Sequence, residues 1–390
     1  MKTRIEVPDN TLFGADNLPY GVFAPEGQDF RVGVRIGDLV IDLAATLPDP
    51  TFAEPSLNAH MAAGPRRWRE VRDRIRELVD DEIPAEAVHP LHDVRTKLPM
   101  TIGDYVDFYA SIDHATNLGR MFRPDAEPLL PNWRHLPVGY HGRAGTVVVS
   151  GTDIVRPHGQ RRTPSGTPDF GPSQRLDIEA ELGFVVGVGS ELGAPIDIDE
   201  FAEHVFGVAL VNDWSARDIQ AWEYQPLGPF LGKSFATSIS PWVTPLVALE
   251  NARIPLPKQE PEPLPYLRSS QKWGLDIDLA VQWNGQTVSH PPYSAMYWSP
   301  AQMLAHLTAN GAATRTGDLY ASGTISGPEP DQRGSFIELS WGGAEPVTVN
   351  GLRRTFLEDG DEVVITASAP GPHRRRIGLG EVRGRIWHAR

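Results

Sequence analysis

Apolar and polar residues alternate in short runs along most of the chain, a pattern that predicts a molecule built mainly from β-strands. In residues 30–43 two such runs flank Gly37 and Asp38, which favours a hairpin. Further strand-like runs cover residues 146–150, 180–188, 207–211, 275–283, 336–341 and 362–368. The 36 prolines and 37 glycines crowd the connections, which is typical of ordered loops around a sheet.

Few segments have the spacing of a helix. Apolar residues in segment 68–79 recur every three or four positions and predict an amphipathic surface helix, whose many charges we interpret as a solvated face without a function. Segments 215–224 and 299–309 are the other candidates. Ser215 and Asp218 have the spacing of a capping box at the start of the first of these two helices.

Length and proline content predict two domains. A chain of 390 residues exceeds a typical single domain, so we expect a small and a large domain, each with its own core. Segment 81–99 contains three prolines and is interpreted as the passage between them. We therefore place the boundary near residue 100, with domains at residues 1–100 and 101–390. The expected fold class is mainly β, of the α+β type.

Composition and charge exclude several classes of protein. Hydrophobic residues make 40% of the chain and charged residues 22%, which is outside the disordered and membrane classes. The formal net charge of -14 disfavours nucleic acid and anionic membranes as partners, so an anionic substrate would need a local basic pocket. The absence of cysteine excludes disulfides and thiolate chemistry. No apolar segment follows the polar start, so we expect a cytoplasmic protein.

Acidic and apolar residues alternate in segment 177–182. On a strand, Asp177, Glu179 and Glu181 would share one face, and like charges this close repel unless they are solvated, protonated or share a cation. Hard cations such as Ca²⁺ and Mg²⁺ prefer oxygen ligands, so one interpretation is a divalent metal site. The other is the solvated face of an edge strand, where acids discourage pairing between sheets. The residues alone leave both open.

A second group of polar residues follows the apolar strand at 207–211. Asp213 lies where a strand end commonly presents a site residue, although it could equally cap the next helix. On that helix Arg217, Gln220 and Tyr224 fall at i, i+3 and i+7 and therefore share a face. A cation, an amide and a phenol together suit an oxygen-rich ligand.

Three further residues are candidates for chemistry. His114 lies within eight residues of Asp107 and Tyr109, which makes it a candidate general base, although the residues alone still favour a structural histidine that packs or bonds to backbone. Lys233 lies in a loop rich in glycine and proline, near a ligand oxygen or simply at the surface. Glu338 is predicted on a strand, pointing away from its two apolar neighbours toward a site or toward water.

Seven segments together resemble the fumarylacetoacetase family, also called the fumarylacetoacetate hydrolase family. They are Asp107–Tyr109, His114–Asn117, Pro131–Trp133, Leu136–Arg143, Asn212–Asp218, Pro226–Phe235 and Ser322–Gly327. The similarity spans nearly the whole chain and is densest from about residue 100 to 340. It implies an SH3-like β-barrel within residues 1–100, a mixed β-roll domain over residues 101–390, and a homodimer in which the large domains pair.

The resemblance also implies roles for individual residues, with a Ca²⁺ or Mg²⁺ ion as cofactor. The metal-site residues would be Asp107, Glu179, Glu181, Asp213, Lys233 and Thr237, which leaves Asp177 without a role. The catalytic residues would be His114 as general base, Glu338 as the carboxylate that orients it, and Arg217, Gln220 and Lys233 as groups that stabilise negative charge. The substrate contacts would be Tyr109, Arg123, Tyr140, Gln220, Tyr224 and Thr324. One local departure, Ile112–Asp113, could change the basicity of His114.

The implied reaction is metal-assisted hydrolysis of the carbon–carbon bond of fumarylacetoacetate, a small diketo acid, to fumarate and acetoacetate at the end of tyrosine and phenylalanine catabolism. Two alternatives remain. An acylpyruvate hydrolase or decarboxylase of the wider superfamily would share Glu179, Glu181 and Asp213, but would usually lack the N-terminal barrel and segment 107–117. A non-catalytic calcium-stabilised β protein would explain the carboxylates alone, and not His114 or the helix face.

Overall fold

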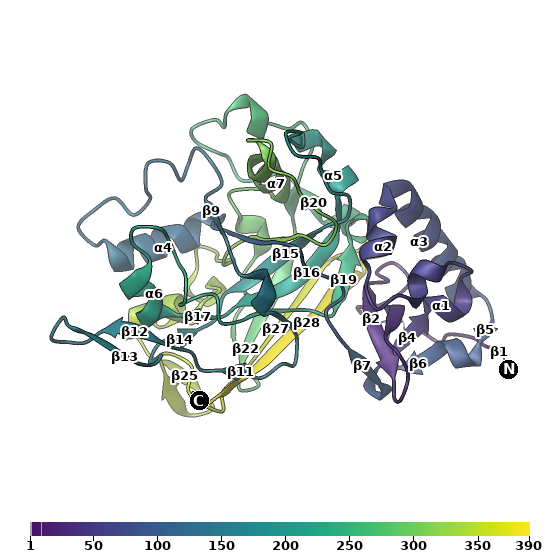
Figure 1. Ribbon diagram of the computed structural model, residues 1–390, viewed down its shortest axis with the longest axis horizontal. Helices are drawn as coiled ribbons and strands as arrows, with labels where there is room; N and C mark the ends of the chain where they lie inside the picture. The colour runs from purple at the N-terminus through teal and green to yellow at the C-terminus, as the bar shows by residue number, and fades with distance from the viewer. Residues whose placement is uncertain (1, 9) are drawn as a thin grey trace.

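The fold is built mainly from β-strands, and the largest sheet runs across the molecule (Figure 1). The computed structural model describes residues 2–8 and 10–390. The sheet has 13 strands, and its main path runs β6-β4-β3-β2-β19-β16-β15-β24-β8-β9. The expectation of a mainly β molecule with mixed sheets is confirmed.

The first hundred residues form the end of this sheet that lies on the right in Figure 1, with three helices beside it. Its strands are β2 (Tyr20–Pro25), β3 (Arg31–Ile36), β4 (Leu39–Asp42), β6 (Val88–Pro90) and β7 (Val94–Thr96). The hairpin predicted at residues 30–43 is β3 and β4, and Gly37 in its turn has a φ of 56°, a conformation that glycine adopts without strain. Segment 81–99 is not a bare passage, because it supplies β6 and β7.

The expected SH3-like barrel is not found, since no barrel closes among the described residues. One edge of β2 pairs with β3, and the other edge pairs with β19 (Trp242–Pro245) and with β7. The ladder to β19 carries the sheet onward into the larger part of the molecule instead of closing it.

Helices cover the N-terminal strands. They are α1 (Leu43–Thr46), α2 (Asn58–Ala62) and α3 (Gly64–Asp80). The predicted amphipathic helix is α3, which buries Val71, Ile75 and Leu78 in a core shared with Val34 of β3. Most of its charged residues are exposed, as expected, but Arg72 is buried and donates to the Asn17 carbonyl.

Two sheets pack against each other in the larger part. The long sheet contributes β16 (Val205–Asp213), β15 (Ala180–Val186), β24 (Leu319–Ala321), β8 (Tyr105–Phe108) and β9 (Gly139–His141). The second sheet consists of β11 (Ile154–Val155), β28 (Arg376–Trp387), β27 (Glu362–Pro370), β22 (Asp278–Trp283) and β23 (Gln286–Ser289). Leu182 and Leu210 of the first sheet share one buried core with Ile365 and Val382 of the second.

One predicted strand is wrong. Segment 336–341 forms the short helix α8 (Phe336–Leu339) rather than a strand. The Asp177 carboxylate accepts hydrogen bonds from the backbone N–H groups of Phe336 and Ile337, which holds this segment as a turn. Apolar alternation alone gave no sign of that distant partner.

The helices near the site also differ in detail from expectation. The predicted helix at 215–224 is α6 (Arg217–Glu223), and no capping box forms, because Ser215 Oγ donates to the Asp213 carbonyl at 3.1 Å. The helix predicted at 299–309 is α7 (Pro300–Thr308), with a capping box between Ser299 and Gln302. A helix that was not predicted, α4 (Ile112–Phe122), carries His114. None of the helices in the described residues is long and apolar enough to cross a membrane.

Candidate active site

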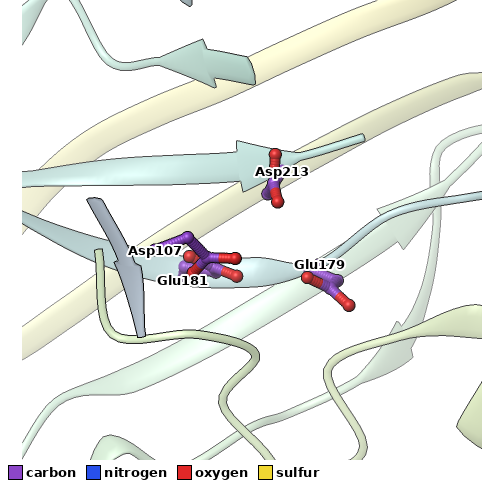
Figure 2. Close-up of side chains that lie close together, drawn as sticks. All are labelled: Asp107, Glu179, Glu181 and Asp213. Atoms are coloured by element: carbon purple, nitrogen blue, oxygen red, sulfur yellow. The ribbon is translucent and has the colours of Figure 1, made fainter. Parts of the chain in front are cut away.

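Four buried carboxylates meet where the strands of the long sheet converge (Figure 2). Asp107 lies on β8, Glu181 on β15 and Asp213 at the end of β16, while Glu179 directly precedes β15. One oxygen of each lies within 4.8 Å of the others, and the four residues are at most 5% exposed. The solvated edge strand considered for segment 177–182 is therefore wrong.

The cluster lacks enough positive partners for its charge. Neither oxygen of Glu181 has a hydrogen-bond partner among the described residues, and Oδ1 of Asp107 has none. Burial raises the pKa of Glu181 well above its ordinary value, and the charges of Asp107 and Glu179 raise this pKa further. Burial, followed by the charge of Asp213, likewise raises the pKa of Asp107. Buried oxygens without donors fit a hard divalent cation such as Ca²⁺ or Mg²⁺.

Lys233 and Thr237 lie beside the cluster. Lys233 Nζ donates to Asp213 Oδ2 at 2.7 Å and to Glu179 Oε2, and Thr237 Oγ1 donates to Asp213 Oδ1 at 2.8 Å. Burial opposes the charge on Lys233, but Asp213 and Glu179 outweigh it and raise the pKa of the ammonium. Burial also opposes ionisation of Glu179, and there Lys233 and Arg217 prevail and lower the pKa. Lys233 is thus a fixed positive charge that orients two of the carboxylates.

The predicted polar face of α6 is present. Arg217 Nη2 lies 2.8 Å from Glu179 Oε1, and its Nη1 donates to Gln220 Oε1 at 3.2 Å. Its Nε donates to Asp177 Oδ2 at 2.8 Å. Tyr224 follows at the end of the helix and is partly exposed. The guanidinium therefore links the carboxylate cluster to the helix face.

His114 is held between two carboxylates. Its Nδ1 lies 2.6 Å from Glu338 Oε2, and its Nε2 lies 3.9 Å from Glu179 Oε1. Glu338 also accepts hydrogen bonds from Asn117 at 3.0 Å and from Ser335 at 2.6 Å. Burial opposes ionisation of Glu338, but His114 and these donors lower its pKa. An ionised Glu338 only accepts, so His114 donates from Nδ1, and in the neutral ring this leaves Nε2 unprotonated and directed toward the cluster.

A cavity of about 450 Å³ is lined both by His114 and by the predicted substrate contacts. The site residues predicted from the sequence that line this cavity are Asp107, Tyr109, His114, Arg123, Tyr140, Glu179, Arg217, Gln220, Tyr224, Lys233 and Thr324. Asp213 and Thr237 border an adjacent cavity of about 380 Å³, which shares Tyr140 and Lys233 with the first. Glu181 and Glu338 border neither cavity and lie behind the residues that do.

Two lining residues keep polar atoms free for a ligand. Arg123 Nη2 donates to the Pro128 carbonyl at 2.7 Å, whereas its Nε has no acceptor among the described residues. The Thr324 hydroxyl is buried and has no partner in the same part of the chain. Buried donors without partners are costly, so both atoms favour a polar ligand in this cavity.

Comparison with known proteins places the chain in a family. The family model described as fumarylacetoacetate (FAA) hydrolase C-terminal matches residues 105–387, and the model described as fumarylacetoacetase N-terminal matches residues 16–99. The fumarylacetoacetases of Rattus norvegicus and Homo sapiens are each 47% identical over 413 residues, which is 99% of this chain and 98% of theirs. This chain belongs to the fumarylacetoacetase family. The Arabidopsis thaliana member is 46% identical over 415 residues, again 99% of this chain and 98% of its own.

Solved structures agree on the fold. The fumarylacetoacetate hydrolase of Exiguobacterium antarcticum has a TM-score of 0.59 at 19% identity and covers 96% of this chain and 100% of its own. A maleylpyruvate hydrolase of Sphingobium sp. SYK-6, solved with manganese and pyruvate, has a TM-score of 0.54 at 15% identity and covers 96% and 100%. At these identities the likeness concerns the fold alone.

Fumarylacetoacetase-family resemblance left three neighbours of the site without a role. Asn117 and Ser335 donate to Glu338, and Asp177 binds Arg217. Asn117 belongs to a segment that carries the resemblance, so only its partner was missing. Asp177 was visible as the first acid of segment 177–182, but its hydrogen bonds from the N–H groups of Phe336 and Ile337, more than a hundred positions away, have no local signal.

Proposed function

We propose that this protein hydrolyses the carbon–carbon bond of fumarylacetoacetate to give fumarate and acetoacetate, the last step of tyrosine and phenylalanine catabolism. Fumarylacetoacetases at 46–47% identity over 99% of the chain support this assignment. The observation that carries it is the position of His114, whose free Nε2 faces a four-carboxylate cluster across a cavity lined by cations and phenols.

His114 acts as the general base. Its Nε2 takes a proton from water while Nδ1–H stays bonded to Glu338, whose negative charge stabilises the imidazolium that forms. The water oxygen adds to the fumaryl carbonyl carbon, and the bond to the neighbouring carbon then breaks. The electron pair leaves with the acetoacetate fragment as an enolate, which takes up the proton from His114.

The developing negative charge needs positive partners. Asp107, Glu179, Glu181 and Asp213 would hold a Ca²⁺ or Mg²⁺ ion, which when bound polarises ketone oxygens and stabilises enolate charge. Arg217 and Lys233 add fixed charges beside Glu179, and the Gln220 amide adds a donor. All three face the cavity and lie within the same buried environment.

The substrate carries two carboxylates, and the protein has a formal net charge of -14. Binding therefore depends on local cations and donors. We assign this role to the cavity-lining side chains of Arg123, Tyr109, Tyr140, Tyr224 and Thr324. The unpartnered Arg123 Nε and Thr324 hydroxyl support the assignment.

An absorbance assay tests the activity. Protein freed of metal by a chelator is mixed with fumarylacetoacetate or with an acylpyruvate, with and without Mg²⁺ or Ca²⁺. We expect turnover of fumarylacetoacetate that returns with either ion and exceeds turnover of the acylpyruvate. Faster cleavage of the acylpyruvate would assign the chain to another hydrolase of the superfamily, and full activity without metal would remove the cation from the reaction.

We also infer that the chain forms a homodimer through its larger part and acts in the cytoplasm. We further infer that it divides near residue 100 into two domains, at residues 1–100 and 101–390, and that the second domain is the β-roll. Family membership supports the dimer, and the two family models, which meet between residues 99 and 105, support the boundary. Light scattering behind size exclusion tests the dimer: a mass near twice 42.9 kDa is expected, and a mass near 42.9 kDa contradicts it.

A further inference from the structure

We propose that Asp177 is a positioning residue that holds Arg217 and the Glu338-bearing turn in a fixed relation across the site. This inference rests on the proposed hydrolysis. Asp177 is fully buried and lies on β14 (Leu176–Asp177), which pairs with β17 (Ser215–Ala216) directly before Arg217.

The Asp177 carboxylate accepts four hydrogen bonds. Oδ2 accepts from Arg217 Nε at 2.8 Å and from the Ile337 N–H at 3.0 Å. Oδ1 accepts from the N–H groups of Phe336 and Ile178, each at 2.7 Å. All its acceptor sites are therefore used by α6, by α8 and by the residue that follows it, and none is left for a metal or a substrate.

Asp177 joins two elements, α6 and α8, and each of them carries a side chain that contacts a residue of the site. Arg217 reaches from α6 to Glu179 of the carboxylate cluster at 2.8 Å. Glu338, one residue after Ile337 on α8, holds His114 Nδ1 at 2.6 Å. His114 Nε2 and Arg217 Nη2 thus both point to the same oxygen, Glu179 Oε1. Asp177 connects the two elements, α6 and α8, that hold these two side chains in place.

A positional role differs from that of a fifth metal ligand. Asp177 is absent from the group of four carboxylates whose oxygens lie together. It does not line the cavity either. Its effect on catalysis therefore passes through Arg217 and the α8 turn, and loss of Asp177 should disturb the charge-stabilising step more than substrate or metal binding.

The variant Asp177→Asn tests this. The amide keeps the shape but replaces one oxygen with NH₂, so at least one N–H faces a donor and Arg217 loses its buried anion. We expect kcat to fall about ten- to hundredfold, the range set by the loss of one charge-assisted hydrogen bond. KM and metal content should stay within about threefold of the parent values, because neither the cavity nor the cluster loses a ligand.

A double-mutant cycle with Arg217→Met separates positioning from general damage. If Asp177 acts partly through Arg217, adding Asp177→Asn to Arg217→Met lowers kcat by a smaller factor than Asp177→Asn does in the parent enzyme. Losses that multiply, or an Asp177→Asn enzyme within twofold of parent kcat, overturn the proposal. The matched control is Asp218→Asn, a carboxylate on the same helix that binds Ser173 and the Gln174 N–H instead, and which should keep parent kcat.

Two further measurements test the proposal if the Asp177→Asn variant does not fold or if the proposed hydrolysis is wrong. Arg217→Lys keeps the charge but cannot bind Asp177 and Glu179 at once, so kcat should fall at least about tenfold, and retention within twofold overturns the proposal. Independently of any substrate, ¹⁵N spectra of arginine-labelled protein should show a protected Arg217 Nε–H, assigned by its loss in Arg217→Lys. A rapidly exchanging Nε–H contradicts the proposal even if fumarylacetoacetate proves not to be the substrate.

Discussion

Glu181 is the residue whose surroundings are most incomplete without a cation. It is fully buried, neither of its oxygens has a donor in the described residues, and burial raises its pKa well above the ordinary value. Such surroundings favour the neutral form of a carboxylic acid, and a nearby positive charge favours the ionised form. Its free energy of ionisation is therefore tied to metal binding.

The first prediction follows for Glu181→Gln. The amide resembles the neutral acid, so the metal-free variant should melt at the parent temperature or above it. Affinity for Ca²⁺ or Mg²⁺ should fall about tenfold or more, because affinity follows ligand charge. Calorimetric titration of both proteins checks this, and identical titration curves would remove Glu181 from the site.

His114→Ala should lose chemistry and keep binding. A general base commonly contributes on the order of a hundredfold or more in rate. Binding of the dianionic substrate, in contrast, does not depend on a charge on His114. We expect kcat to fall by at least about a hundredfold with a much smaller change in KM, measured by steady-state kinetics. A kcat within a few-fold of parent would make His114 structural.

Arg123→Met should lower kcat/KM selectively. Loss of a charge-assisted hydrogen bond costs roughly 1.5 to 3 kcal/mol, which is about ten- to hundredfold. A diketone without the distal carboxylate should be cleaved about equally by variant and parent. An equal loss on both substrates would show that Arg123 supports the fold or the metal instead.

At the scale of elements, the packing of α2 on the sheets depends on a buried histidine. His60 of α2 lies among Tyr20, Phe52 and Phe206 at ring separations of 5.3 to 5.6 Å, and neither ring nitrogen has a partner among the described residues. Burial, followed by the positive charge of Arg67, lowers the pKa of His60 to about 4. Asp49 opposes this shift.

A pH-dependent stability follows from His60. In the unfolded chain the His60 ring binds a proton below about pH 6.5, and in the folded protein only below about pH 4. The contribution of His60 to the free energy of unfolding is therefore full above pH 6.5 and is lost as the pH falls toward 4. Between pH 7 and pH 5 this removes about 2 kcal/mol. His60→Phe should lose less stability over this interval in urea titrations, and parallel curves for the two proteins would contradict the assignment.

The strands could largely be predicted from the sequence, because a two-residue period is a local signal, and segment 180–188 contains β15. The acids of segment 177–182 were visible too, but the residues alone left their burial open, and only the family resemblance assigned Glu179 and Glu181 to one cluster. The environment of Glu338 could not be predicted, since its segment turns into α8 through hydrogen bonds to Asp177, which lies about 160 residues earlier. Non-local contacts of this kind leave no periodicity.

At the scale of the whole molecule, the two parts of the chain share one sheet. Residues Tyr20 and Gly21 of β2 pair with Val243 and Trp242 of β19, both of which are buried. Removing residues 1–99 would uncover that strand edge and its apolar side chains. The fragment Met100–Arg390 should therefore self-associate in light scattering, and a monodisperse, fully active fragment would contradict this.

The position of β24 sets when the site can exist. Asp107 on β8 reaches the carboxylates of β15 and β16 only through β24, whose residues Leu319–Ala321 pair with both β8 and β15. A ribosome makes Asp107 more than two hundred residues before it makes that strand. A nascent chain therefore cannot bring the four carboxylates together until most of its length has emerged, so a cation that needs all four of them would bind only after synthesis is nearly complete.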